Sequence, residues 1–414
     1  MNANVNRIEL LLMTLKQHTA TPGHGVTRLT YTREHLGARR VLFEAMEKYG
    51  LTISEDGFGN MFGKLEGTDP TLPSVLIGSH IDSVPNGGAY DGAAGVAVAL
   101  EVAAMFHENK LQPKRSVEFV ALIEEEGARF PGGLLGSRSM LGDLSVEEFE
   151  HLKSFDGLTT VAAIEQIGLD LPERKPRPID TIHSFLELHI EQGPILTENN
   201  KQIGIVETIV GLAQLEVTVQ GRAGHAGTTP MDKRADALVT ASKIVANLPT
   251  LIQDQTALGT VITVGQMDVH PNSPNVIPER VHFTIDLRSS TLESIEAAKS
   301  RLNDFIELHE SEHVEVTIEE TLNVTPRHMD ETLQQHIYRS CSERNYSSIQ
   351  MSSGAGHDAM VFADYVPTAM IFVPTENSVS HAPEETASTE DLARGANVFF
   401  DTVVQLTEPE IVER

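Results

Sequence analysis

Histidines and carboxylates that could bind a metal ion stand at the ends of predicted strands. The segment GSHIDS, residues 78–83, is followed by a glycine-rich stretch that returns Asp91. His80 and Asp91 suit a metal ion, and Asp82 is placed to bind the far imidazole nitrogen of His80. Taken alone, a strand-end histidine with a capping aspartate is the commoner arrangement. Functional loops of open α/β sheets nevertheless lie at strand carboxyl ends, which favours the metal.

Further groups of this kind follow along the chain. EEEG, residues 124–127, comes directly after an apolar strand. Three adjacent carboxylates repel one another unless a cation lies among them, and a solvated charge run is the alternative. Alternation places Glu187, His189 and Glu191 on one face of a strand, for which a solvent-facing edge is the alternative. The remaining groups are GHAGTTPM (224–231), SGAGHD (353–358) and SHAPE (380–384).

Together these groups supply nitrogen and oxygen ligands without sulfur. Such a set suits two divalent ions, such as zinc or manganese, that share a bridging carboxylate. A spare glutamate beside the ligands could accept a proton from metal-bound water. The sequence contains no G-x-S-x-G elbow, P-loop, G-x-G-x-x-G or H-E-x-x-H motif. The candidate ligands are His80, Asp91, Glu126, His189 and His381.

Alternating strands and helices must position these residues. Strands at 73–77 and 116–123 flank a helix at 92–108, which predicts an α/β layer with a partly parallel sheet. Between 215 and 318 the order is strand–helix–strand–strand–helix–strand, a split βαβ plait. We therefore expect a discontinuous domain, 1–211 and 329–414, with a plait inserted at 212–328. Further helices are predicted at 33–49, 136–141, 232–246, 292–309, 329–345 and 389–406. Two strands joined by a glycine-bearing turn are predicted within 51–67, and single strands at 184–190, 203–209, 260–267, 281–287 and 368–374.

Composition narrows the class of protein. The 414 residues carry 31 Lys+Arg and 59 Asp+Glu, a net charge of −28, which argues against nucleic acid and anionic membranes as partners. The single cysteine, Cys341, excludes an internal disulfide framework and fits a reducing compartment. No transmembrane span or signal-peptide pattern is evident, so we expect a cytoplasmic protein.

Longer strings carry a family resemblance. The chain resembles the M20 metallopeptidase-like superfamily, and within it the hydantoinase/carbamoylase branch. That branch includes N-carbamoyl-L-amino acid amidohydrolases, allantoate amidohydrolases and β-ureidopropionases. The matching strings are GVTRL (25–29), GSHIDSVPNGGAYDG (78–92), EEEGARFP (124–131), ELHIEQG (187–193), GHAGTTPM (224–231), NVIPERVHFTIDLR (275–288), SGAGHDA (353–359) and SHAPEE (380–385).

The resemblance implies a fold and a set of roles. The fold is α/β, a mixed-sheet, two-metal aminopeptidase-like catalytic domain with an inserted α+β plait that serves as dimerisation and lid domain. Asp91 would bridge two divalent ions per subunit, zinc, manganese or cobalt, with Glu126 and His381 completing the ligands of one ion. Glu125 would be the general base. In a homodimer, His225 would reach the partner's site and steady the oxyanion.

The resemblance also implies an anionic ureido substrate. The residues that would hold it are Gln192, Asn275, Arg288, Gly354, Ala355 and Gly356. Allantoate-specific relatives place an arginine eleven residues before the plait histidine, where this chain has Gln214. The neutral residue favours N-carbamoyl-L-amino acids, whereas the 353–359 string resembles the allantoate branch equally. The alternative activities are therefore hydrolysis of allantoate, then that of a β-ureidopropionase, dipeptidase or aminoacylase. The alternative for Arg288 is a surface residue of a strand, and the alternative for Asn275 is a turn residue.

Overall fold

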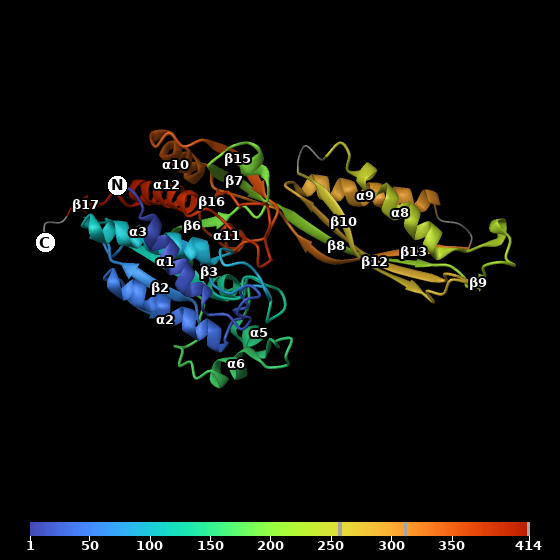
Figure 1. Cartoon of the computed structure of the whole chain (residues 1–414), viewed down its shortest axis with the longest axis horizontal. Coiled ribbons are helices and arrows are strands. Elements are labelled where there is room, and N and C mark those ends of the chain that lie inside the picture. Colours follow the sequence, from blue (N-terminus) through green and yellow to red (C-terminus); the bar gives the residue numbers. More distant parts are fainter. Residues whose placement is uncertain (256–258, 310–312, 412–414) are drawn as a thin grey trace. The chain divides into compact units, whose positions relative to one another are not determined.

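The computed structural model describes residues 1–255, 259–309 and 313–411 and divides the chain into two compact units. Unit 1 comprises Met1–Glu207, His328–Met351 and His357–Arg414, and unit 2 comprises Thr208–Arg327 and Ser352–Gly356 (Figure 1). The expected domains divide the chain at 211/212 and 328/329. They differ from these units mainly at residues 352–356, which group with unit 2.

A mixed sheet forms the centre of unit 1. Its strand order is β1-β2-β5-β3-β6-β16-β7-β14, with β15 paired to β7. β3 runs parallel to β5 and β6, and β16 runs parallel to β6, so the carboxyl ends of these strands meet at one edge. The strands are β1 (Thr52–Glu55), β2 (Met61–Leu65), β3 (Ser74–His80), β5 (Val117–Leu122), β6 (Ile182–Ile190), β7 (Ile203–Ile209), β14 (Arg327–His328), β15 (Ser348–Ser353) and β16 (Thr368–Val373). The pair β4 (Leu111–Gln112) and β17 (Glu410–Ile411) lies apart from this sheet.

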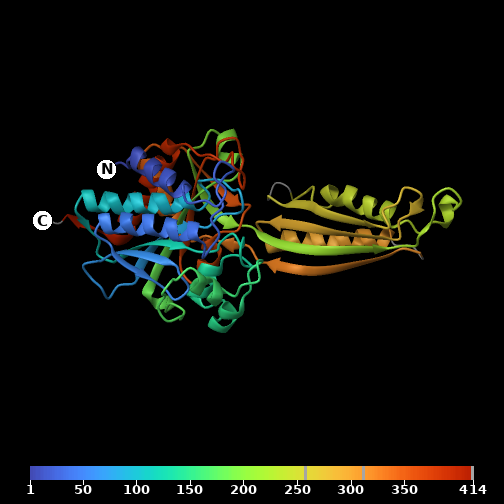
Figure 2. The ribbon, with the colours of Figure 1, turned by 60° about the horizontal axis from the view of Figure 1, so that its bottom comes forward.

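A helical layer supplies the main apolar core of unit 1. α3 is buried over almost its whole length because it packs between the sheet, α1 and α12, which explains its apolar sequence. α1, α2 and α3 lie side by side (Figure 2). Cys341 is buried in this core, and burial raises the pKa of its thiol to about 12. The helices of the layer are α1 (Val5–Lys16), α2 (Arg33–Lys48), α3 (Ala93–Glu108), α10 (Glu331–Glu343) and α12 (Thr389–Thr407).

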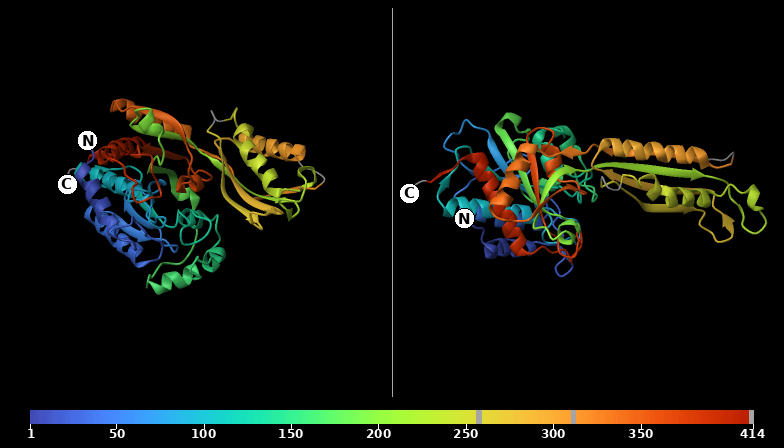
Figure 3. Two further views of the ribbon diagram at one scale, coloured as in Figure 1. Left: turned by 45° about the vertical axis from the view of Figure 1, so that its right-hand side comes forward. Right: turned by 90° about the horizontal axis from the view of Figure 1, so that it is seen from above.

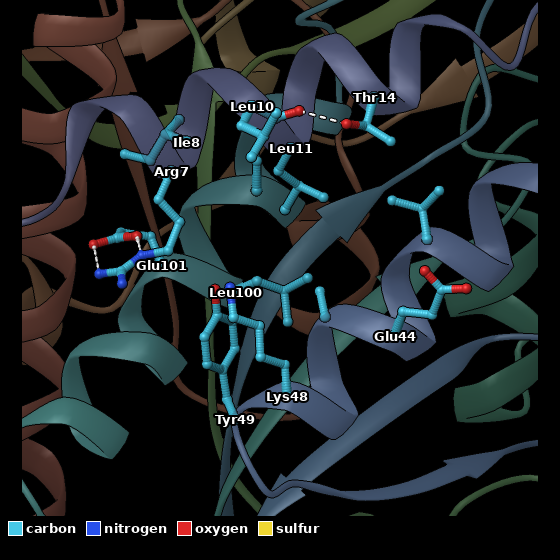
Figure 4. Close-up of a pocket in the computed structure, with 13 residues that line it drawn as sticks. Arg7, Ile8, Leu10, Leu11, Thr14, Glu44, Lys48, Tyr49, Leu100 and Glu101 are labelled. Atoms are coloured by element: carbon cyan, nitrogen blue, oxygen red, sulfur yellow. Dashed lines mark hydrogen bonds and ion pairs between the residues drawn. The ribbon is translucent and has the colours of Figure 1, made fainter.

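A groove of about 220 Å³ opens between α1, α2 and α3 (Figure 4). The Arg7 guanidinium at its wall is held by Glu101, at 2.8 Å from Nη2 to Oε1, and by Glu108. None of the candidate site residues lines this groove.

Short helices connect the strands of unit 1. Ser145 and Glu148 form a capping box at the start of α5, and the Thr159 side chain caps α6. A hydrophobic cluster that includes Phe58, Phe130 and Phe149 packs against these helices. These connections are α4 (Leu135–Leu141), α5 (Val146–His151), α6 (Thr160–Gln166), α7 (Ile195–Glu198), α11 (Asp358–Phe362) and the 3₁₀ turn η1 (Ile179–Thr181).

Unit 2 is the predicted plait. Its antiparallel sheet has the order β10-β12-β8-β13, and α8 and α9 cover one face (Figure 3). α8 begins at Ala237, capped by Asp236, rather than at 232, because residues 231–233 form a 3₁₀ turn after Pro230. The elements are β8 (Gly211–Gln220), β9 (Gly224–His225), η2 (Met231–Lys233), α8 (Ala237–Leu251), β10 (Val261–His270), β11 (Val276–Ile277), β12 (Arg280–Ser289), α9 (Leu292–His309) and β13 (Glu315–Val324).

Among the described residues, no helix combines the length and the apolar character that crossing a membrane requires.

Candidate active site

Three of the candidate metal ligands meet at the carboxyl edge of the unit 1 sheet. His80 ends β3, His189 lies one residue before the end of β6, and Asp91 precedes α3. Asp91 Oδ1 lies 3.1 Å from His189 Nε2 and 3.6 Å from His80 Nε2. Gly92 allows this approach, because a Cβ at this position would overlap the His80 ring. The φ of Gly92 is 59°, which also favours glycine.

A second group forms on the other oxygen of Asp91. Asp91 Oδ2 lies 3.2 Å from His381 Nε2, which is 3.5 Å from Glu126 Oε2. The two groups that could hold a cation therefore share Asp91. Glu126 Oε1 is buried and has no hydrogen-bond partner among the described residues, as expected of a carboxylate that awaits a cation.

The buried histidines present their Nε2 atoms as ligands. His189 Nδ1 lies 2.9 Å from the Ile190 carbonyl, and His80 Nδ1 lies 3.2 Å from the Asp82 carbonyl. A carbonyl only accepts hydrogen bonds, so Nδ1 carries the proton and the Nε2 lone pair faces the site. Gly92 N–H also donates to His189 Nε2. The expected partner of His80 Nδ1, the Asp82 carboxylate, lies 3.6 Å away, and the shorter contact of Nδ1 is to the Asp82 backbone carbonyl.

The Asp82 carboxylate instead holds the neighbouring loop. Its two oxygens accept the backbone N–H groups of Glu125 and Glu126, each at 3.1 Å. Glu124 turns away from the site, with φ at 52°, and accepts the N–H groups of Arg129 and Phe130. The EEEG segment is therefore not a solvated charge run: only its second and third carboxylates face the ligands.

Burial and mutual repulsion shift the pKa values of these carboxyls. Burial, followed by the charge of Asp91, raises the pKa of Glu126 to about 8. Burial also raises the pKa of Glu125 well above its ordinary value, although His80 opposes the shift. The effect of burial on Asp91 is outweighed by the close approach of His189, His381 and His80, which lowers the pKa of Asp91 well below the ordinary value. Glu125 Oε2 lies 3.8 Å from His80 Nε2, beside the ligands but outside both groups.

The Glu187–Glu191 face is not a solvent-facing edge. Glu187 is fully buried and accepts hydrogen bonds from Ser79 Oγ at 2.7 Å and Ala359 N at 3.0 Å. Glu191 accepts the backbone N–H groups of Ile195 and Leu196 at the start of α7. Of the three alternating residues, only His189 belongs to a group that could hold a cation.

Sequence reasoning missed a buried pair that supports the site. The His357 ring packs against the His189 ring, 4.6 Å between centroids. Asp358 Oδ1 accepts the Ser137 hydroxyl at 2.6 Å, and burial raises the pKa of Asp358 to about 8. Both residues belong to the SGAGHD group, so the sequence did mark this segment. Sequence alone does not distinguish a residue that packs against a metal ligand from the ligand itself.

Gln192 contacts the shared carboxylate. Its Nε2 donates to Asp91 Oδ2 and to Ser380 Oγ, each at 3.1 Å. Its backbone, at φ 61°, donates to Thr375 Oγ1. Glu385, which sequence reasoning also passed over, accepts from Asp91 N at 2.9 Å and from Ser380 Oγ at 2.8 Å. Nothing in the SHAPEE string distinguishes this glutamate from its exposed neighbour Glu384.

The other candidate residues lie in unit 2 and form two groups. At one end of the sheet, Arg288 Nε and Nη2 bind both oxygens of Asp286, and Nη1 donates to the Gly354 carbonyl at 2.9 Å. Gln214 is exposed and pairs with Asp286 across β8 and β12. Within the described part of the chain, three of the five guanidinium N–H donors are thus engaged, which leaves two for a further acceptor. Ala355 completes this segment, its N–H donating to Ser353 Oγ.

His225 and Asn275 lie at the opposite end of the unit 2 sheet. His225 pairs with Val276 in the short β9–β11 ribbon, and the Asn275 carbonyl accepts from Ala226 N. The exposed His225 ring accepts the Gly227 N–H at Nδ1, at 3.0 Å, so the neutral ring carries its proton on Nε2. This tautomer is a hydrogen-bond donor.

Comparison with known proteins places the chain in a family. The profile of peptidase family M20/M25/M40 matches residues 76–405. An N-carbamoyl-L-amino-acid amidohydrolase of Paenarthrobacter aurescens is 41% identical over 401 residues, which cover 96% of this chain and 97% of the relative. An allantoate amidohydrolase of Bacillus subtilis (strain 168) is 36% identical over 95% of each chain. The crystal structure of a hydantoinase/carbamoylase family amidase from Burkholderia multivorans superposes with a TM-score of 0.92 at 34% identity, covering 98% of each chain. The chain therefore belongs to peptidase family M20/M25/M40 and is a hydrolase.

Proposed function

We propose that this hydrolase cleaves N-carbamoyl-L-amino acids to an L-amino acid, ammonia and carbon dioxide, with two divalent ions per subunit. The observation that carries the proposal is the carboxylate of Asp91, whose two oxygens face different ligand groups while Glu125 stands beside them. Its nitrogen and oxygen donors suit zinc, manganese or cobalt. Bound ions would acidify water and polarise the ureido carbonyl.

Glu125 is the proton carrier in this proposal. Its carboxylate takes a proton from the attacking water and returns it to the leaving nitrogen of the amino acid. A base works best when its pKa lies near the working pH, and burial shifts Glu125 in that direction. The carbamic acid formed decomposes to ammonia and carbon dioxide.

His225 supplies the hydrogen bond to the developing oxyanion. Because Gly227 N–H occupies Nδ1, the ring offers Nε2–H to the substrate oxygen without gaining a proton first. Arg288, held by Asp286, offers its two remaining N–H donors to the substrate carboxylate. Asn275 and residues 354–356 are proposed to contribute further polar contacts.

The register of unit 2 supports a homodimer with shared sites. β8 pairs Gly211 with Ser289 at one end and Gln220 with Arg280 at the other. From Arg280 to Arg288 a strand advances roughly 25 Å at about 3.3 Å per residue. Arg288 and His225 lie toward opposite ends, so one chain does not bring both to one small substrate. In the proposed dimer, one subunit contributes Arg288 and its partner contributes the histidine.

Gln214 supports N-carbamoyl-L-amino acids as substrates. It lies opposite Asp286 and thus near Arg288, where a neutral residue adds no second cation for a longer ureido substrate. Allantoate is the second candidate, supported by the Bacillus subtilis relative.

The test measures ammonia release by the metal-loaded protein from N-carbamoyl-L-methionine and from allantoate side by side. Turnover of the first alone supports the proposal. Turnover of allantoate alone replaces it with the second candidate. Hydrolysis of N-acetyl-L-methionine without either would move the protein to the aminoacylases.

A further inference from the structure

Four residues close a ring of hydrogen bonds that includes the shared carboxylate of Asp91. Gln192 Nε2 donates to Asp91 Oδ2 and to Ser380 Oγ. Ser380 Oγ donates to Glu385 Oε2, and Glu385 Oε1 accepts the Asp91 backbone N–H. The ring therefore runs from Asp91 through Gln192, Ser380 and Glu385 back to Asp91.

Glu385 is built into this position. It is 4% exposed, and its Oε1 also accepts the Tyr90 N–H at 3.2 Å. A Cβ at Gly88 would collide with Oε1, so the glycine permits the carboxylate to reach the loop. All three donors are N–H or O–H groups, which makes a carboxylate the fitting acceptor.

The ring joins two ligand-bearing loops that are far apart in sequence. Ser380 precedes the candidate ligand His381, and the Asp91 backbone belongs to the other loop. His381 is half exposed and has φ at 55°, so its own burial does little to hold it. The contacts of Ser380 and Glu385 supply that restraint.

The direction of the hydrogen bonds also orients the Gln192 amide. The Ser380 hydroxyl gives its proton to Glu385 and so accepts from Gln192, and the Asp91 carboxylate only accepts. Both hydrogens of the amide are thereby used. The amide oxygen, Oε1, is then the acceptor that Gln192 can offer to an N–H group of a ureido substrate.

We propose that Glu385 is a positioning residue of the metal centre, which holds Asp91 and the His381 loop together through Ser380 and Gln192. This inference rests on the proposed two-metal function, but it concerns metal binding rather than turnover. Asp82 plays a similar part in another loop, because its carboxylate holds the backbone of Glu125 and Glu126.

The experiment compares Glu385→Gln with Glu384→Gln, which removes the same charge from the adjacent, exposed residue. The full chain is stripped with a chelator, and Mn²⁺ binding is followed by calorimetry with no substrate present. We expect Glu384→Gln to match the unsubstituted chain, and Glu385→Gln to bind one of the two ions roughly 10- to 100-fold more weakly. Ser380→Ala should weaken the same ion by a smaller factor.

Ser380→Ala guards against a folding failure of Glu385→Gln, since it removes one hydroxyl and no charge. Wild-type Mn²⁺ affinity in a folded Glu385→Gln or Ser380→Ala protein overturns the inference, and so does equal weakening by Glu384→Gln. The two proposals fail in different ways. A chain that binds two ions but releases no ammonia refutes the function and leaves this inference intact.

Discussion

The candidate residues fall in two regions whose construction differs. At the sheet edge of unit 1, His80, His189 and Asp91 are at least 95% buried. Backbone carbonyls orient the two histidines, and the Gln192 amide donates to the Asp91 carboxylate. In unit 2, His225 is exposed on the short β9–β11 ribbon, and Arg288 on β12 is about one third exposed. Ligands that must displace water from a cation need burial, whereas groups that meet a substrate only when it arrives need access.

The largest effect is expected from Glu125→Gln. The amide cannot take a proton, so turnover should fall by about 10²- to 10⁴-fold. Metal content should stay normal, because Glu125 lies outside both ligand groups. Ammonia release and metal analysis of the same preparation check both points, with Glu147→Gln on the surface of α5 as the control. Substantial residual turnover would remove Glu125 from the role of base.

His225→Ala tests the exposed region. Loss of one oxyanion donor should lower kcat by roughly 10²- to 10³-fold. The melting temperature should change little because the side chain is exposed, and the exposed His270→Ala gives the control. When His225→Ala is mixed with Glu125→Gln, heterodimers should regain partial activity. Confirmed heterodimers without recovery would contradict the sharing of sites.

Metal affinity of the buried region should depend on pH. In the metal-free protein Glu126 has a pKa of about 8 and His381 of about 9, so both hold protons at neutral pH. A cation must displace those protons, and its affinity should fall by about tenfold per pH unit below 8 for each proton displaced. Titrations with Mn²⁺ at pH 6, 7 and 8 measure this slope. An affinity independent of pH would mean that these two groups are not ligands.

The smallest effect is expected from Gln214→Arg. The new guanidinium faces Asp286 and competes with Arg288 for it, so kcat/KM for N-carbamoyl-L-methionine should fall by a few-fold, about 1 kcal/mol. The ratio of allantoate to N-carbamoyl turnover should rise. Gln220→Arg, on the same face at the other end of β8, is the matched control. If both variants respond equally, Gln214 does not determine the choice of substrate.

The sequence predicted the strand ends well because the signals there are local. Apolar strands end at histidines and carboxylates, so the residue pattern alone was enough to place His80 and His189. The order of elements in the plait was predicted correctly, whereas α8 begins and ends five residues later than expected. Its start was misplaced because a 3₁₀ turn follows Pro230, and residue pattern does not separate such a turn from a helix.

Hydrogen bonds between distant segments were beyond such reasoning. Glu385 reaches Asp91 across 294 residues, and Asp82 reaches the Glu125 backbone across 43. Identical neighbours, such as Glu384 and Glu385, differ only in which of them turns inward. The separation of Arg288 from His225 likewise follows from strand register, which a single sequence does not reveal.

The lone thiol of Cys341 offers a way to watch one unit alone. Because it is buried in the core of unit 1 with a pKa of about 12, alkylating reagents must wait until that core opens. The rate of alkylation therefore reports the opening of unit 1, while unit 2, which has no cysteine, contributes no signal. An ion that binds only the closed state of unit 1 lowers the population of the open state and so slows the alkylation of Cys341. The rate of alkylation therefore measures metal occupancy without a substrate.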